Sequence, residues 1–245
     1  MKTRSKALLL SLCAVLLVAA SVLGTMAYLT DSETVTNTFT VGQVHLTLDE
    51  AKVNPMGQPL DKNGKAPDEE GYESGKLDRW QPTTDDPEQE YHLLPGHSYT
   101  KDPTVTVDAG SEESYVRMMA TITYKAEADA VFAEYKTDNL FAPWLNINND
   151  WQVNGDPMTT KDEGAGTISR TYEFRYKTTV DASEAQNGVK LAPLFTTLTV
   201  PGGVTNEEIA YLADMNITVE AHAIQASGFE SVDAAWNAFD TQKNA

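Results

Sequence analysis

The chain has 245 residues, enough for one domain or two, and it carries 18 Lys and Arg against 36 Asp and Glu, a formal charge of −18 at pH 7. This acidic balance excludes a protein that holds nucleic acid through its phosphates, and it excludes a polybasic module that binds membrane surfaces. Hydrophobic residues make up 41% of the chain, which suffices for a packed core. The single cysteine excludes an internal disulfide and a Cys-rich metal cluster.

Residues 1–27 have the organisation of a signal peptide. Three basic residues among the first six precede an apolar run over residues 7–23, and small residues follow up to Ala27. We expect cleavage between Ala27 and Tyr28. The alternative is a retained anchor, since the apolar run reaches the lower limit of about 17 residues for a membrane span. Cleavage also removes Cys13, and a chain without cysteine suits export from a bacterium better than passage through a disulfide-forming compartment.

The remaining residues, 28–245, are predicted to form a single domain built mainly of strands. Alternation of apolar and polar residues, or a β-branched run, indicates strands at 39–48, 103–108, 114–124, 167–177, 194–200 and 216–226. Short helices are expected at 127–135, at 206–213 behind a capping box of Thr205 and Glu208, and after Ser231. Short strands, turn-rich connections and few helices predict an all-β fold, a jelly-roll-like antiparallel β-sandwich with a few short helices.

Residues 51–90 interrupt the strand pattern. This stretch is acidic and rich in Pro and Gly, and we interpret it as a long surface loop or irregular insert. Asp61-Lys-Asn63-Gly64 resembles a fragment of a calcium loop, but the residues that follow lack the expected ligand and glycine. A solvated acidic loop is therefore the preferred interpretation over a calcium site.

No sequence motif predicts catalysis. A nucleophile elbow, a phosphate-binding loop and the His-Glu-x-x-His motif of zinc proteases are all absent from the sequence. His92 and His97 lie five residues apart and are weak candidates for a zinc site that would need a distant carboxylate. We therefore predict no catalytic residue, no cofactor and no metal site, with polar residues at a loop end as the preferred interpretation of the two histidines.

The segment from Tyr28 to Thr38 becomes the new N-terminus after cleavage. It is rich in Thr, prone to form a strand, and free of Pro and Gly. An extended tail of this kind can pair with an open sheet edge of another subunit. We predict that it is a donor strand, with Tyr28, Leu29, Val35 and Phe39 as its apolar residues. The alternative is that it forms the first strand of its own sandwich, or frays.

Three blocks of sequence resemble a known family of exported proteins. Residues 25–44 contain Ala-Tyr-x-x-Asp beside the cleavage site, followed by Thr-Asn-x-Phe-x-x-Gly. Leu94-Pro-Gly96 with Lys101-Asp-Pro103 forms a second block, and Asp214–Val219 with Gly228-Phe229 belongs to a third. The chain thereby resembles clostridial members of the TasA/camelysin family, whose signal peptides are removed by a SipW-type signal peptidase. The resemblance is weakest over the insert.

The resemblance implies a jelly-roll-like sandwich that is secreted to the cell surface or extracellular matrix of a Gram-positive bacterium. It also implies, in the fibre-forming members, donation of the new N-terminal strand to the next subunit. We therefore expect a structural subunit of surface or biofilm-matrix fibres whose main partner is a second copy of itself. Other matrix or cell-surface components are possible further partners. Nucleic acid is not expected as a partner, and the membrane is contacted only through the uncleaved signal segment.

Two alternatives stay open at this stage. One is a monomeric surface binding or adhesion module that makes contact through the acidic insert. The other is a camelysin-like zinc metalloprotease that uses some of the four histidines, His45, His92, His97 and His222. The sequence offers no recognisable protease motif, so the resemblance transfers no metal ligands to this chain.

Overall fold

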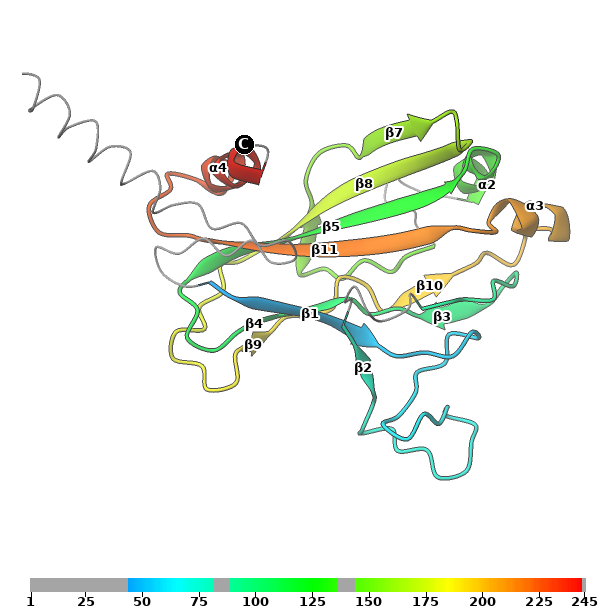
Figure 1. Ribbon diagram of the computed structural model, residues 1–245, viewed down its shortest axis with the longest axis horizontal. Helices are drawn as coiled ribbons and strands as arrows, with labels where there is room; N and C mark the ends of the chain where they lie inside the picture. The colour runs from blue at the N-terminus through cyan, green and yellow to red at the C-terminus, as the bar shows by residue number, and fades with distance from the viewer. Residues whose placement is uncertain (1–43, 82–88, 136–143, 244–245) are drawn as a thin grey trace, which may run out of the picture.

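The structure, a computed structural model, describes residues 44–81, 89–135 and 144–243. This part of the chain consists mostly of strands in antiparallel sheets, together with three short helices, so the predicted all-β sandwich is confirmed (Figure 1). The elements are β1 (Leu46–Ala51), β2 (Arg79–Trp80), β3 (Ser98–Thr100), β4 (Thr104–Val107), β5 (Ser114–Lys125), α2 (Ala128–Tyr135), β6 (Trp151–Val153), β7 (Met158–Asp162), β8 (Thr167–Tyr176), β9 (Val189–Lys190), β10 (Thr197–Thr199), α3 (Asn206–Tyr211), β11 (Asn216–Gln225) and α4 (Val232–Lys243).

A five-stranded sheet forms one layer. Its order is β11-β5-β8-β6, and β7 also pairs with β8. The long strands form because they alternate: every second residue of β5, from Val116 to Ile122, is buried in the core, while the residues between them face outwards. On β11 the predicted inward residues, from Ile217 to Ala223, pack against the same core, and Ile224 packs on the opposite face.

A second layer lies beneath the first and contains two smaller sheets. One has the order β2-β1-β4-β9, and the other pairs β3 with β10 (Figure 1). Val105 and Val107 of β4 and Tyr99 of β3 are fully buried against the five-stranded sheet. The main core therefore lies between the two layers, as in a sandwich.

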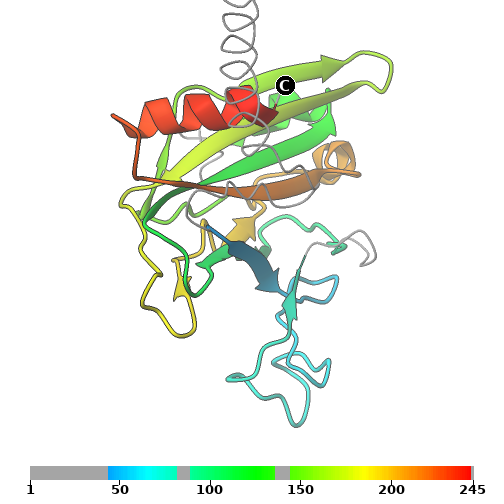
Figure 2. The ribbon, with the colours of Figure 1, turned by 60° about the vertical axis from the view of Figure 1, so that its left-hand side comes forward.

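The helices cover edges and one outer face. Val131 and Phe132 of α2 are buried in the main core. α3 begins with the predicted capping box, in which Thr205 Oγ1 accepts from the Glu208 amide at 3.2 Å and Glu208 Oε2 accepts from the Thr205 amide at 2.8 Å. α4 begins after Ser231, whose Oγ accepts from the Ala234 amide at 3.1 Å. It lies across the outer face of the five-stranded sheet (Figure 2).

Several boundaries differ from those predicted. The run at 194–200 supplies only the three residues of β10, because Leu194 and Phe195 are buried as irregular chain. α3 ends at Tyr211, two residues early. β7 was not predicted from the sequence, because its five residues are all exposed and carry no apolar alternation.

Asp61 organises the described part of the insert. The side chain of Asp61 is fully buried. Its Oδ1 accepts from the amides of Asn63 at 2.8 Å and Lys65 at 3.0 Å, and its Oδ2 accepts from the amide of Glu73 at 3.0 Å. The prediction of a solvated loop is wrong at this residue, because backbone amides take the place of water around the carboxylate. They also hold the pKa of Asp61 below its usual value, the Lys65 amide most of all.

Candidate docking groove

Two strand edges face each other across the open side of the sandwich. β11 is an edge strand that pairs with β5 alone within the part of the chain that the structure describes. β1 pairs with β4 through Leu46–Asp49 and with β2 only through Glu50 and Ala51. The outer edge of β1 therefore lacks a described strand partner along most of its length. β1 and β11 lie side by side without sharing a hydrogen-bond ladder (Figure 1).

The alternation of hydrogen bonds along β11 shows which of its backbone N–H and C=O groups point towards the open side of the sandwich. Just beyond β11, the Ala226 amide donates to the Glu113 carbonyl oxygen at 2.8 Å. Counting back from Ala226 towards Asn216, every second residue is therefore hydrogen-bonded to β5. Ser114, the partner of Gln225, exchanges hydrogen bonds with Val180 instead, as this alternation requires. The residues in between therefore point their N–H and C=O groups away from β5. They are Ile217, Val219, Ala221 and Ala223.

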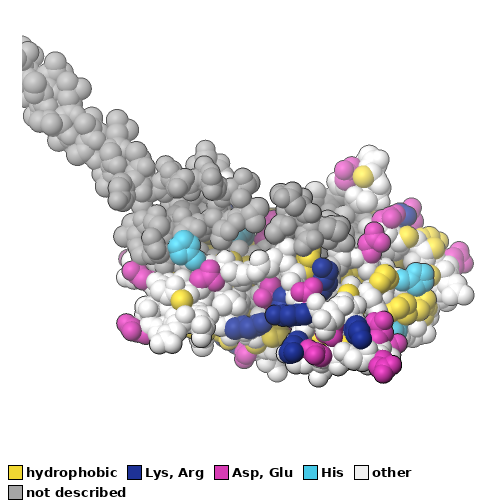
Figure 3. Space-filling view, turned by 60° about the horizontal axis from the view of Figure 1, so that its bottom comes forward, with side chains coloured by type: hydrophobic (Ala, Val, Ile, Leu, Met, Phe, Trp, Pro, Cys, Tyr) yellow, Lys and Arg dark blue, Asp and Glu magenta, His cyan; other side chains and the backbone are white. Residues whose placement is uncertain are grey.

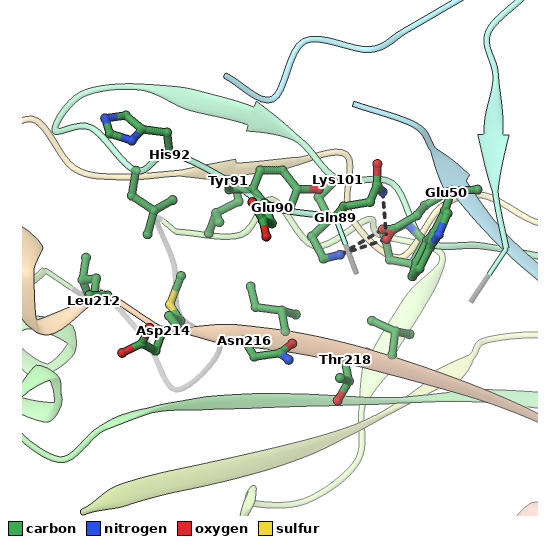
Figure 4. A pocket seen from close by; sticks show the side chains of 18 of the residues that line it. Glu50, Gln89, Glu90, Tyr91, His92, Lys101, Leu212, Asp214, Asn216 and Thr218 are labelled. Atoms are coloured by element: carbon green, nitrogen blue, oxygen red, sulfur yellow. Dashed lines mark hydrogen bonds and ion pairs between the residues drawn. The ribbon is translucent and has the colours of Figure 1, made fainter. Parts of the chain in front are cut away.

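A groove of about 930 Å³ follows these two edges. Leu48 and Asp49 of β1 form one wall and Asn216–Val219 of β11 form the other. Residues 89–93 continue the β1 side, and the end of α3 closes one side (Figure 4). The lining combines free strand edges with apolar side chains, contributed by Leu48, Leu93, Leu198, Ile209, Leu212, Met215, Ile217 and Val219. An extended polypeptide needs both features to bind. Its backbone N–H and C=O groups pair with a free strand edge, and its alternating side chains contact an apolar lining.

A buried ion pair forms the floor of the groove. Lys101 Nζ lies 3.0 Å from Glu50 Oε2 and 3.1 Å from Glu50 Oε1, and their side chains are only 8% and 7% exposed. Gln89 joins them by donating from Nε2 to Glu50 Oε1 at 3.2 Å and to the Ala51 carbonyl at 3.1 Å (Figure 4). Gln89 also accepts from the Val53 amide at 2.7 Å. These contacts fix residues 50–53 and 89 to one another.

Arg79 anchors β2 where the free edge of β1 ends. Its Nη1 donates to Asp102 at 2.6 Å and its Nε donates to Asp49 at 3.0 Å. The other oxygen of Asp102 accepts from the Ala51 amide at 2.6 Å. Because β2 occupies the edge of β1 at Glu50 and Ala51, an incoming strand can use this edge only as far as Asp49.

Two aromatic residues give the groove a polar lining. Burial raises the pKa of Tyr91, and the charges of Glu50 and Asp102 raise it further, so the phenol stays neutral and donates to the Thr100 carbonyl at 3.3 Å. Trp80 also lines the groove, and its buried indole N–H has no hydrogen-bond partner among the described residues.

The mainly apolar groove also has acidic side chains in its lining, most of them paired with a cation. Asp49 pairs with Arg79, Glu50 with Lys101, and Asp214 with Lys125 at 2.9 Å, and Glu90 lines the groove beside them. The face of the molecule seen in Figure 3 shows Lys and Arg side chains gathered among Asp and Glu near its middle. An acidic polypeptide entering the groove would meet like charge.

The structure places only some of the predicted site residues. Ala27, Tyr28, Leu29, Val35 and Phe39 lie outside the described residues, so neither the cleavage site nor the donor segment is placed.

The candidate metal-binding histidines contact other groups of the protein or lie at its surface. His92 is exposed on the rim of the groove. His97 Nε2 lies 2.9 Å from the Met56 carbonyl oxygen, and its ring packs on Tyr99. His45 is exposed before β1, while His222 lies on β11 against α4. Within the described ranges, no group of three or more His, Cys, Asp or Glu is positioned to hold a metal ion.

The sequence analysis missed the ion pair and the glutamine at the floor of the groove. Glu50, Gln89 and Lys101 are far apart in the sequence, and no spacing rule connects them. The sequence did predict the strand at 216–226, which forms β11 and one wall of the groove.

Comparisons add no family assignment. The chain was compared with protein-family models, curated proteins and solved structures, and none of them matched. In the part of the chain that is described, no helix has the length and apolar character needed to cross a membrane.

Proposed function

We propose that this chain is an exported structural subunit of cell-surface or biofilm-matrix fibres. In this proposal the segment 28–38 of one subunit enters the groove between β1 and β11 of the next subunit. The observation that carries it is the pair of strand edges that face each other across an apolar groove. The jelly-roll-like arrangement and the secreted location implied by the TasA/camelysin resemblance belong to the same proposal.

The groove constrains the direction of a donated strand. β1 and β11 run in opposite directions, so a strand between them is antiparallel to one and parallel to the other (Figure 1). β11 offers the longer edge, since the free edge of β1 ends at Asp49. We therefore expect an antiparallel ladder with β11, in which each hydrogen bond contributes about 0.5–1.5 kcal/mol net. Head-to-tail donation leaves one tail and one groove free at the ends, so it produces filaments.

Binding of a synthetic peptide tests this proposal without requiring polymerisation. The peptide has the sequence of residues 28–38, and the acceptor is the chain that begins at Phe39. Titration calorimetry is expected to show saturable binding. Val219→Pro removes an amide that points into the groove while leaving the ladder with β5 intact, so it should abolish binding. Val219→Ala is the matched control, because it shortens the same side chain but keeps the amide, and it should still bind.

The opposite result would favour another function. If the peptide does not bind to a folded acceptor at any salt concentration or pH, strand donation is wrong. The monomeric surface binding module then becomes the better hypothesis.

A further inference from the structure

The C-terminal helix rests on a small apolar cluster that is separate from the main core. Ile224 of β11 and Ala235, Trp236 and Phe239 of α4 are buried in it. The same cluster lies on the outer face of the five-stranded sheet, away from the groove (Figure 2). α4 is thus held by a limited set of contacts, and it can separate from the sheet without opening the main core.

A buried arginine at the centre of this interface faces α4. Arg117 of β5 has a side chain that is 3% exposed, and its guanidinium carbon lies 4.4 Å from the Trp236 ring centroid and 5.0 Å from that of Phe239. It donates from Nη1 to Asp240 Oδ2 at 3.0 Å, and Nη2 also pairs with Asp240. A buried guanidinium needs every one of these partners, because water does not reach it.

His222 of β11 completes the set of partners. Arg117 Nε donates to His222 Nδ1 at 3.2 Å, and the imidazole packs on Phe239 with ring centroids 4.8 Å apart. Nδ1 must carry a lone pair to accept this hydrogen bond, so His222 is neutral while α4 is docked. A protonated ring would place a second positive charge against Arg117 and remove its acceptor.

We propose that α4 is a pH-sensitive latch, which proton uptake by His222 releases from the sheet. The groups that face His222 oppose one another. Arg117 on β5 and Lys243 on α4 disfavour the proton, whereas Glu220 on β11, 3.6 Å from Nε2, and Asp240 on α4 favour it.

The neighbouring strand β8 contributes charges at the edge of the same interface. Glu173 lies 3.6 Å from Arg117, and Arg175 pairs with both Glu173 and Asp233 of α4. These charges lie around Arg117 and the start of α4. Protonation of His222 therefore affects the docking of α4 mainly through Arg117.

The direction of the pH effect follows from the docked state. Burial, and then the charge of Arg117, lower the pKa of His222 from its ordinary 6.5 to about 4. The equilibrium constant for docking of α4 is therefore at its maximum above pH 6.5. It falls by up to about tenfold per pH unit as the pH is lowered from 6.5 towards 4. Asp240 does not produce this effect, because the hydrogen bond from Arg117 holds its pKa below the ordinary 3.8.

Fluorine NMR of the protein labelled with 5-fluorotryptophan tests the latch, with the Trp236 signal assigned from Trp236→Phe. Trp144 and Trp151 lie in the main core and serve as internal controls for global folding. Between pH 6.5 and 4, the Trp236 signal should move to a solvent-exposed position while the two core signals stay unchanged. His222→Asn keeps an acceptor for Arg117 without titrating, so its Trp236 signal should stay in place. His222→Gln repeats the test should the Asn variant fail to fold.

Two results would overturn the latch. One is a Trp236 signal that stays unchanged in the natural chain down to pH 4. The other is the same transition in a folded His222→Asn or His222→Gln variant. Neither result bears on strand donation, because α4 and the groove lie on different faces of the sheet.

Discussion

Lys101 and Glu50 form an ion pair with an Nζ–Oε2 distance of 3.0 Å on the floor of the groove, and each side chain is less than a tenth exposed. The pair joins the residue after β3 to β1. The hydrogen bond from Gln89 to Glu50 connects the segment 89–93 to them. A buried pair of this kind contributes little net stability when intact, but its loss leaves an isolated charge in the interior. It therefore fixes the geometry of the groove more than it stabilises the fold.

Removing one partner of this pair should be costly. Lys101→Met leaves Glu50 without its cation, and we expect the free energy of unfolding to fall by about 3–5 kcal/mol. The double variant Glu50→Gln with Lys101→Met removes both charges and should recover most of this loss. Urea unfolding of the three proteins provides the measurement. A loss below about 1 kcal/mol for the single variant would show that water reaches Glu50.

The insert should depend on the carboxylate of Asp61. Asp61→Ala leaves three backbone amides and the Asn63 side chain without their acceptor. Hydrogen exchange of the amides of Asn63, Lys65 and Glu73 should accelerate, while exchange in β5 stays slow. Unchanged protection of these three amides would contradict the assigned role of Asp61.

Acid should loosen the same part of the insert. The pKa of Asp61 is lowered in the folded state, chiefly by the hydrogen bond from the Lys65 amide, so its contribution is present above the ordinary 3.8 and is lost as the pH falls below that value. Proton NMR of the insert amides between pH 5 and pH 2 measures this directly. Protection that remains constant through the acid limb would be inconsistent with it.

The capping box should contribute to the stability of α3, which closes one side of the groove. Thr205→Ala removes the acceptor for the Glu208 amide and should lower the free energy of unfolding by about 1 kcal/mol. Thr205→Ser keeps the oxygen and should be close to neutral. Thermal unfolding of the three proteins distinguishes these cases. Equal losses in both variants would assign the effect to the threonine methyl group instead.

Assembly should respond to charge. Glu90 lines the groove beside the paired acids Asp49 and Asp214, the whole chain has a formal charge of −18, and the donor segment carries Asp31 and Glu33. Salt screens this repulsion and acid removes it, so light scattering should increase with salt and with decreasing pH. The variant Asp31→Asn with Glu33→Gln should assemble at low salt. Scattering that stays flat across salt and pH would contradict this expectation.

The strands that build the core could be predicted from the sequence, because burial imposes a period of two on them. Residues 114–124 and 216–226 alternate over much of their length, and both form long strands of the five-stranded sheet. The capping box at Thr205 has a local geometry, so four residues of sequence sufficed to predict where α3 begins. β7 has no buried face and left no pattern.

The groove could not be predicted in the same way. Its floor brings Glu50, Gln89 and Lys101 together from three segments, and only the fold determines that they meet. The order around Asp61 also escaped prediction, because its hydrogen-bond partners are backbone amides, which every sequence carries. The open edge of β11 is a property of topology, and composition does not report it.

The central claim is that residues 28–38 of one subunit occupy the groove of another. Size-exclusion chromatography with light scattering, applied to the chain that begins at Tyr28 and to the chain that begins at Phe39, tests it most directly. Our account predicts high-mass species from the longer chain alone, and their loss in the longer chain that carries Val35→Pro or Val219→Pro. Monomers from both chains at every salt concentration and pH would contradict it.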